Sequence, residues 1–138
     1  MNKNFGLKAE GWIIEIMKVA GYRVTRSTEL DDKVHKVDFW VSRDNYWLAI
    51  QFSIDRQKVV NGKGKDALRR GIVPSWLDGQ ELEQAVNGHP ELRSRLVAQF
   101  WRQADAIVAA YPQCKLRRPA VPALRERTTQ LAGACRSG

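Results

Sequence analysis

Two apolar, β-rich segments joined by a short polar turn constrain the fold of this chain more than any other feature. The segments are residues 36–41 (KVDFWV) and 47–53 (WLAIQFS). Between them, residues 42–45 read Ser-Arg-Asp-Asn, a composition typical of turns. The sequence therefore predicts a β-hairpin with strands at about 34–42 and 46–54.

One face of this hairpin is predicted to be polar and the other apolar. Successive side chains of a strand point to opposite faces, so Lys36, Asp38 and Trp40 would share one face of the first strand. On the second strand the same alternation groups Ala49, Gln51, Ser53 and Asp55. The opposite face would carry Val37, Phe39, Val41, Leu48, Ile50, Phe52 and Ile54. Polar side chains on a strand that is otherwise buried indicate a functional site.

Each polar side chain also has a structural alternative. Lys36 would then be a solvated charge at a strand edge, and Asp38 would be an acid paired with a nearby arginine. Gln51 and Ser53 would form a hydrogen-bonded pair on a half-exposed face. For Asp38 a functional site is the preferred interpretation, because a lone acid among large apolar residues is costly to bury.

Periodicity and glycine or proline stops predict the remaining elements. They are a helix at 6–20, a strand at 22–27, a glycine-containing basic loop at 59–64, a helix at 65–70, a strand at 72–77 and helices at 80–86 and 91–110. Pro74 lacks an N–H, so its strand suits the edge of a sheet or a bulge. The predicted fold class is α/β, with an αβββαβ core, a four-stranded mixed sheet flanked by helices, and further C-terminal helices.

The chain is strongly basic, with 23 Lys and Arg against 15 Asp and Glu, a net charge of +8. Such an excess attracts polyanions, of which nucleic acid is the commonest; an acidic protein partner or solubility alone are the alternatives. The length of 138 residues suits one domain, predicted at 1–111. From 112 onward, prolines and basic residues predict a tail at 112–138.

Membrane insertion and secretion are not expected from the sequence. No apolar run approaches the roughly 18 residues that a membrane span needs. The N-terminal residues are not followed by the apolar core of a signal peptide. Cys114 and Cys135 lie outside the patterned region and lack metal-site spacing, so a cytoplasmic location is expected.

An acidic residue of the first predicted helix, Glu10, lies on the same stripe as Ile14 and Met17. This position turns its carboxylate toward the packed side of the helix, or toward the edge of that side, where an acid needs a partner. Alternatively, Glu10 is an exposed acid near the helix start that interacts favourably with the helix dipole.

Together with the order of elements, these residues resemble the PD-(D/E)XK nuclease superfamily over residues 6–77. In that superfamily an acid of the first helix, an Asp on the second strand and a (D/E)-X-K motif on the third strand converge on one site. Glu10 matches the helix acid and Asp38 matches the strand acid. The residues Gln51-Phe52-Ser53 stand in the position of (D/E)-X-K.

The resemblance implies a Mg²⁺-dependent endonuclease, with Mn²⁺ as a second usable metal and with DNA favoured over RNA as the substrate. Glu10, Asp38 and Gln51 would be the metal ligands, because carboxylate and amide oxygens suit this hard cation. Two carboxylates and a neutral amide would hold Mg²⁺ more weakly than three carboxylates would.

The motif departs from the superfamily at Ser53, which cannot supply the positive charge of the missing lysine. Some members of the superfamily carry this lysine elsewhere around the site. Lys36 is the first candidate here because it shares a strand face with Asp38, Lys58 is the second and Lys33 is the third. The candidate catalytic residues are therefore Asp38, Gln51, Lys36, Ser53 and Lys58.

Nucleic acid would be held by the basic residues that follow the hairpin and by the tail: Lys58, Lys63, Lys65, Arg69, Arg70, Arg117 and Arg118. Trp40 and Trp47 are near enough to stack on a base, although a core position is preferred for both. By analogy with other nucleases of this fold, a homodimer would form through 91–110. The alternative function is the same fold without activity, which binds nucleic acid or a protein partner.

Overall fold

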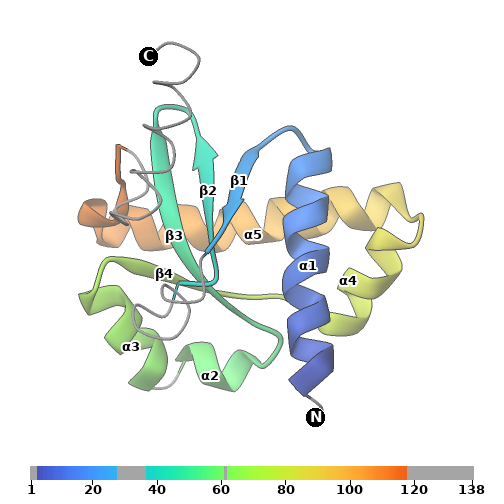
Figure 1. Cartoon of the computed structure of the whole chain (residues 1–138). Helices are drawn as coiled ribbons and strands as arrows, with labels where there is room; N and C mark the ends of the chain where they lie inside the picture. The colour runs from blue at the N-terminus through green and yellow to red at the C-terminus, as the bar shows by residue number, and fades with distance from the viewer. Residues whose placement is uncertain (1–2, 28–36, 61, 118–138) are drawn as a thin grey trace, which may run out of the picture.

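The computed structural model describes residues 3–27, 37–60 and 62–117 (Figure 1). Its elements are α1 (Lys3–Val19), β1 (Arg23–Arg26), β2 (Phe39–Arg43), β3 (Tyr46–Ser53), α2 (Arg56–Val60), α3 (Gly62–Arg69), β4 (Ile72–Trp76), α4 (Gly79–Val86), α5 (Pro90–Ala110) and the 3₁₀ helix η2 (Pro112–Cys114). Lys36 and Arg118 lie outside the described residues. None of the described helices is long and apolar enough to cross a membrane.

The four strands form one mixed sheet in the order β1-β2-β3-β4. The first three strands pair antiparallel, whereas β4 runs parallel to β3 after a crossover through α2 and α3. The predicted α/β fold, with its four-stranded mixed sheet flanked by helices, is confirmed. Pro74 lies in β4 at an edge of this sheet, where its missing N–H disrupts no further strand pairing.

The hairpin between β2 and β3 turns through only two residues, Asp44 and Asn45. Asp44 has a φ of 57°, in the left-handed region that Asp and Asn tolerate better than most residues do. The short turn fixes the register of the two strands, with Phe39 opposite Ile50.

The main core lies between one face of the sheet and the helices α1 and α5. Phe39, Ile50 and Val73 of the strands are fully buried there, together with Ile13 of α1 and Phe100 of α5. The apolar stripes that helical periodicity predicts for these two helices face this side of the sheet. The short helix α4 packs against α1 and α5 (Figure 1).

A smaller apolar cluster lies on the opposite face of the sheet, under α3. Its buried members are Val37, Trp40, Ala49, Ala67 and Ile72. The prediction that Val37 shares a face with Phe39 is wrong, because strand geometry begins only at Phe39 and Val37 packs with Trp40 instead. The predicted polar face is therefore apolar around Trp40 and Ala49, and polar groups remain only toward the end of β3.

The predicted basic loop at 59–64 is largely helical, so that prediction is wrong. The helix α2 continues to Val60 and α3 begins at Gly62. Gly64 is buried against α2, and a Cβ atom at this position would lie 1.9 Å from the carbonyl oxygen of Val59. Glycine thus permits the close approach of two helices here. In the sequence, a glycine with this role cannot be distinguished from a glycine in a loop.

Beyond α5 the chain stays packed against the sheet. Cys114 is fully buried. Leu116 pairs with Trp47 through two backbone hydrogen bonds of 2.6 and 3.0 Å. Because β4 pairs only with residues 49–53 of β3, Leu116 occupies the adjoining part of the same edge. Residues 112–117 therefore lie on the fold, 118–138 lie outside the described residues, and the domain boundary at 111 stays a prediction.

Candidate functional site

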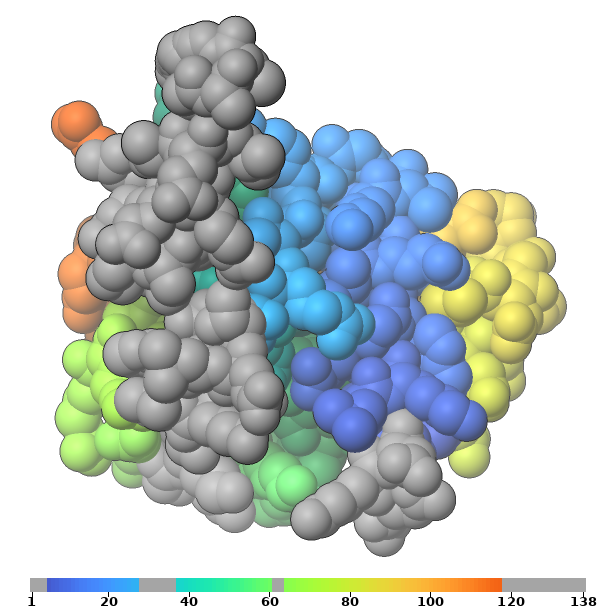
Figure 2. Space-filling view, in the orientation of Figure 1, coloured from blue at the N-terminus to red at the C-terminus, as the bar shows by residue number. Residues whose placement is uncertain are grey.

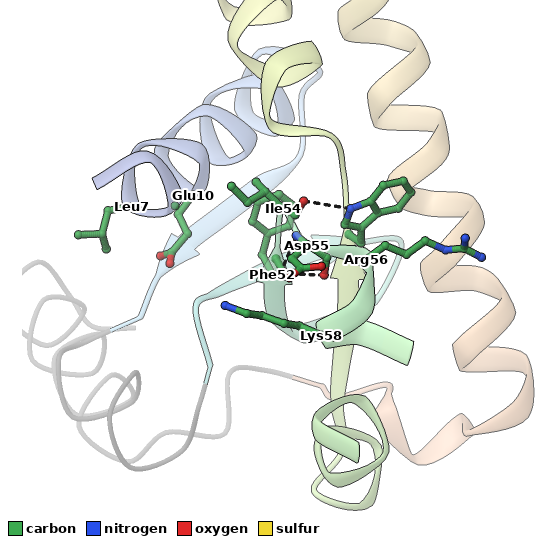
Figure 3. A pocket seen from close by; sticks show the side chains of 10 residues that line it. Leu7, Glu10, Phe52, Ile54, Asp55, Arg56 and Lys58 are labelled. Carbon is green, nitrogen blue, oxygen red and sulfur yellow. Dashed lines mark hydrogen bonds between the residues drawn. The ribbon is translucent and has the colours of Figure 1, made fainter. Parts of the chain in front are cut away.

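An open pocket of about 700 Å³ lies at the ends of the parallel strands β3 and β4 (Figure 3). Ends of this kind commonly form ligand sites in sheets with parallel strands. The pocket is lined by α1, by the segment that leaves β3, by α2 and by the end of β4, through Gly6, Leu7, Glu10, Phe52, Ser53, Ile54, Asp55, Arg56, Lys58 and Trp76. Three of the predicted site residues, Glu10, Ser53 and Lys58, are among them.

The carboxylate of Asp38 is bound to the middle of the third-strand motif. Its Oδ2 accepts a hydrogen bond of 2.7 Å from the backbone N–H of Phe52. The N–H of Asp38 itself donates to the carbonyl of Ile50 at 2.8 Å, immediately before β2 begins. Asp38 is only 9% exposed, so the pairing of the two strands holds a buried acid in contact with the Gln51-Phe52-Ser53 segment.

Gln51 lies beside the pocket but is not among its lining residues, unlike its neighbours Phe52 and Ser53. It is half-buried on β3 and stands opposite Pro74 of β4. Alternation along the strand places its side chain on the face of the sheet that α3 covers, opposite that of Phe52. The structure therefore brings Gln51 next to the other site residues without placing it in the pocket wall.

Ser53 stabilises a turn and supplies no charge. Its Oγ donates to the carbonyl of Asp55 at 3.1 Å and accepts from the N–H of Asp55 at 2.9 Å. The carboxylate of Asp55 then accepts from the N–H of Gln57 at 3.0 Å, in the first turn of α2. These bonds connect the end of β3 to the helix that carries Lys58, so Ser53 contributes to the position of that lysine.

Glu10 and Lys58 reach the pocket from different helices. Glu10 is half-buried on α1, as its place at the edge of the apolar stripe requires, whereas Lys58 is exposed on α2. Figure 3 shows both side chains extending toward the same open space. Of the three candidate lysines, Lys36 and Lys33 lie outside the described residues, and Lys58 lines the pocket.

The donor atoms of Glu10, Asp38 and Gln51 are all oxygens, which suits Mg²⁺, but of the three only Glu10 lines the pocket. Within 3–27, 37–60 and 62–117 there is no group of three or more His, Cys, Asp or Glu that could hold a metal ion. Two carboxylates alone would not complete such a site, so the amide oxygen of Gln51 would have to act as the third protein ligand. The metal site stays a prediction.

Several of the predicted nucleic-acid-binding residues lie on α2 and α3 or just beyond α3, and Arg117 lies after η2. Lys58, Lys65, Arg69, Arg70 and Arg117 are exposed. Lys63 belongs to α3, but its side chain is not described, and Arg118 lies outside the described residues. Trp40 is buried, and Trp47 is half-buried with the Arg23 guanidinium carbon 5.2 Å from its ring centre. Both indoles pack as parts of the fold.

The sequence did not identify Trp76 as a pocket residue. The indole Nε1–H of Trp76 donates to the carbonyl of Ile54 at 3.2 Å, which joins the end of β4 to the segment after β3. A tryptophan at the carboxyl end of a parallel strand could indicate a pocket residue. The sequence alone does not show that β4 runs parallel to β3, so this signal could not be used. Leu7 and Arg56 also line the pocket, and no sequence pattern distinguished them from other surface residues.

Comparison of the chain with protein-family models, with curated proteins and with solved structures gives no match. The resemblance to PD-(D/E)XK nucleases therefore rests on the order of elements and on a few residues, and it stays a prediction. The same holds for the nucleic-acid partner, for the homodimer through 91–110 and for the cytoplasmic location.

Proposed function

We propose that this protein is a metal-dependent nuclease that hydrolyses phosphodiester bonds of DNA. The hydrogen bond from the Phe52 N–H to the Asp38 carboxylate carries the proposal, because it joins the acid of the second strand to the motif of the third. Glu10 and Lys58 add a second carboxylate and a cation at the pocket that Phe52 also lines. The exposed basic residues of α2 and α3 would hold the phosphates of the substrate.

The residues divide the work between binding the metal and stabilising charge. Glu10, Asp38 and Gln51 would hold Mg²⁺, which would supply Lewis-acid activation of water and of the phosphate. Lys58 would stabilise the negative charge that develops on the phosphate, the role for which the hydroxyl of Ser53 is unsuited. The Phe52 N–H fixes the orientation of the Asp38 carboxylate without help from a ligand.

Nicking of supercoiled DNA in Mg²⁺ or Mn²⁺ tests the proposal. We expect wild type to nick the DNA and Asp38→Asn to lose this activity, because Asn keeps an oxygen for the Phe52 N–H but removes the negative charge. The matched control is Asp44→Asn, at a turn position with 76% of the side chain exposed and a backbone conformation that Asn tolerates. Wild type that nicks in neither metal, or Asp38→Asn that nicks as well as wild type, would contradict the proposal.

The role of Lys58 has its own test. Lys58→Ala is expected to slow nicking by about 100-fold or more, the range in which a positioned charge or proton donor contributes. Lys18→Ala removes an exposed lysine from the last turn of α1 and is the matched control, since Lys18 does not line the pocket. Equal rates for the two variants would remove Lys58 from the mechanism.

A nuclease fold without activity is the second candidate, and the state of Ser53 favours it. The Ser53 hydroxyl is engaged with Asp55 in a local turn, in the position where the superfamily has a catalytic lysine. On this hypothesis wild type binds DNA without nicking it, and Ser53→Lys creates metal-dependent nicking. Nicking by wild type would exclude this candidate.

A further inference from the structure

We infer that a second cleft, between α3 and the residues that follow α5, binds a base and adjacent phosphates of single-stranded DNA. The inference rests on the proposed function and deepens it, since it names the form of DNA that this protein engages. The cleft has a volume of about 350 Å³ and is lined by Lys65, Leu68, Arg69, Tyr111 and Gln113. Figure 2 shows the two segments side by side at one margin of the molecule, α3 in light green and the residues after α5 in orange.

One wall of the cleft supplies positive charge. Lys65 and Arg69 are four residues apart on α3, so their side chains leave the same face of the helix, with Cβ atoms about 5–6 Å apart. Both are exposed. In the part of the chain that the structure describes, neither forms an ion pair, so both charges are available to an anion. Two cations at this spacing suit one phosphate or two consecutive phosphates of a DNA strand.

The other wall supplies an aromatic ring. Tyr111 caps the C-terminal end of α5 and is 39% exposed, whereas every other Phe, Trp or Tyr whose side chain the structure describes is buried or half-buried. Its ring stacks on no other ring and lies under no cation among the described residues. Leu68, which is half-buried, and Gln113, which is exposed, also line the cleft. A ring beside cations is the arrangement that stacks a base while its phosphate is held.

This arrangement favours a single strand over a duplex. In a duplex the faces of the bases are covered by their neighbours, so Tyr111 would have to unstack a base pair to reach one. The basic helices also connect the two sites, because α3 follows α2, which carries Lys58 into the catalytic pocket. A strand bound in the second cleft would thus continue over a basic surface toward that pocket.

Fluorescence anisotropy with a labelled 15-nucleotide oligothymidine tests the inference, in EDTA so that no cutting occurs. Tyr111→Ala and Tyr111→Leu are expected to bind about 5- to 150-fold more weakly than wild type, and Tyr111→Phe to bind like wild type. Leu keeps an apolar side chain, so it separates loss of the ring from loss of packing at the end of α5. The plot of log K against log salt has a negative slope. Lys65→Ala should make this slope less negative by about 0.7, whereas Lys18→Ala should change it little.

The outcomes separate this inference from the proposed function. Loss of single-strand binding in Tyr111→Leu, with binding to a blunt duplex unchanged, supports the cleft whether or not wild type nicks DNA. Equal single-strand binding by Tyr111→Leu and wild type overturns the cleft, and nicking that depends on Asp38 would still support the nuclease. Wild type that binds no oligothymidine overturns the cleft. A complex that poly-glutamate displaces as well as unlabelled oligothymidine does also overturns the cleft, in favour of an acidic protein partner.

Discussion

The side-chain amide of Gln103 binds both backbone groups of Trp76. Its Nε2 donates to the Trp76 carbonyl at 2.7 Å, and its Oε1 accepts from the Trp76 N–H at 3.0 Å. Trp76 is the last residue of the edge strand β4 and lines the pocket. The amide on α5 thus takes the place of a neighbouring strand and fixes the end of β4 at the candidate site.

Replacing this amide is expected to destabilise the protein. Gln103→Leu removes both hydrogen bonds at nearly constant size, and Gln103→Glu removes the donor to the Trp76 carbonyl. Each should lower the free energy of unfolding by about 1–3 kcal/mol, because partly buried backbone groups lose their partners. Urea denaturation measures the change, and Gln84→Leu on the exposed side of α4 is the control. A loss no larger than that of the control would show that water replaces the amide.

Asp38 is expected to stabilise the fold as well as to serve the site. Asp38→Ala leaves the buried N–H of Phe52 without its acceptor and should cost about 1–3 kcal/mol in the free energy of unfolding. Asp38→Asn retains an acceptor oxygen and should cost less. Urea denaturation of both variants checks this order. If both lose the same stability, the bond to Phe52 is not what Asp38 contributes to folding.

Two glycine-to-alanine variants should have opposite effects. Gly64→Ala places a Cβ 1.9 Å from the Val59 carbonyl oxygen, so α2 and α3 must move apart, at a cost of about 1–3 kcal/mol or more. Gly6→Ala on α1 meets nothing within 4 Å and should stabilise by about 0.5–1 kcal/mol. Thermal unfolding of the pair measures both shifts. A stabilising Gly64→Ala would show that the two helices do not pack this closely.

The thiol of Cys114 is expected to be protected and to make stability depend on pH. Burial raises its pKa above the ordinary value of 9.0, so less of the reactive thiolate is present at a given pH. In a Cys135→Ser background, iodoacetamide should modify Cys114 slowly in buffer and rapidly in urea.

The sign of the pH effect follows from the raised pKa of Cys114. The unfolded chain loses the thiol proton first as the pH rises, so the free energy of unfolding should fall above about pH 9. Cys114→Ala should lack this component, which urea titrations at pH 8 and pH 10 would detect. Fast modification of the folded protein would contradict the buried position.

Patterns within one element predicted most of the fold. The helical stripes of α1 and α5, the turn before Tyr46 and the missing N–H of Pro74 are local signals, and each placed an element or an edge correctly. At 59–64 the local signal misled, because a glycine that permits helix contact at Gly64 looks the same in sequence as a glycine that ends a helix. The sequence pattern predicted Val37 on the wrong face of the sheet. Pairing with the neighbouring strand determines where a strand begins, and the residues of the strand alone do not show this position.

Contacts between distant residues had no sequence signal. The guanidinium carbon of Arg43 lies 4.0 Å from the ring centre of Trp101, and the same group binds Asp105 on α5. It also donates to the hydroxyl of Tyr46, three residues further along the hairpin. Burial lowers the pKa of Arg43, but the hydrogen bonds from its guanidinium to Asp105 and Tyr46 raise the pKa above its ordinary value.

For the candidate site, the sequence offered residue types and their order along the chain, and their assignment to a site stays a prediction. The bond between Asp38 and Phe52, the turn made by Ser53 and the walls added by Trp76 needed the three-dimensional structure. Hydrogen bonds of this kind depend on how separate elements are placed in space, which local patterns do not encode.

The pairing of Leu116 with Trp47 has a consequence for how this chain folds. The two residues are 69 positions apart (116 − 47), so this part of the sheet edge is completed by residues that follow α5. Bringing such distant segments together costs chain entropy and slows folding. During synthesis, β3 would emerge from the ribosome long before its partner, and a chain that ended at 111 would expose the Trp47 backbone and lose the buried Cys114.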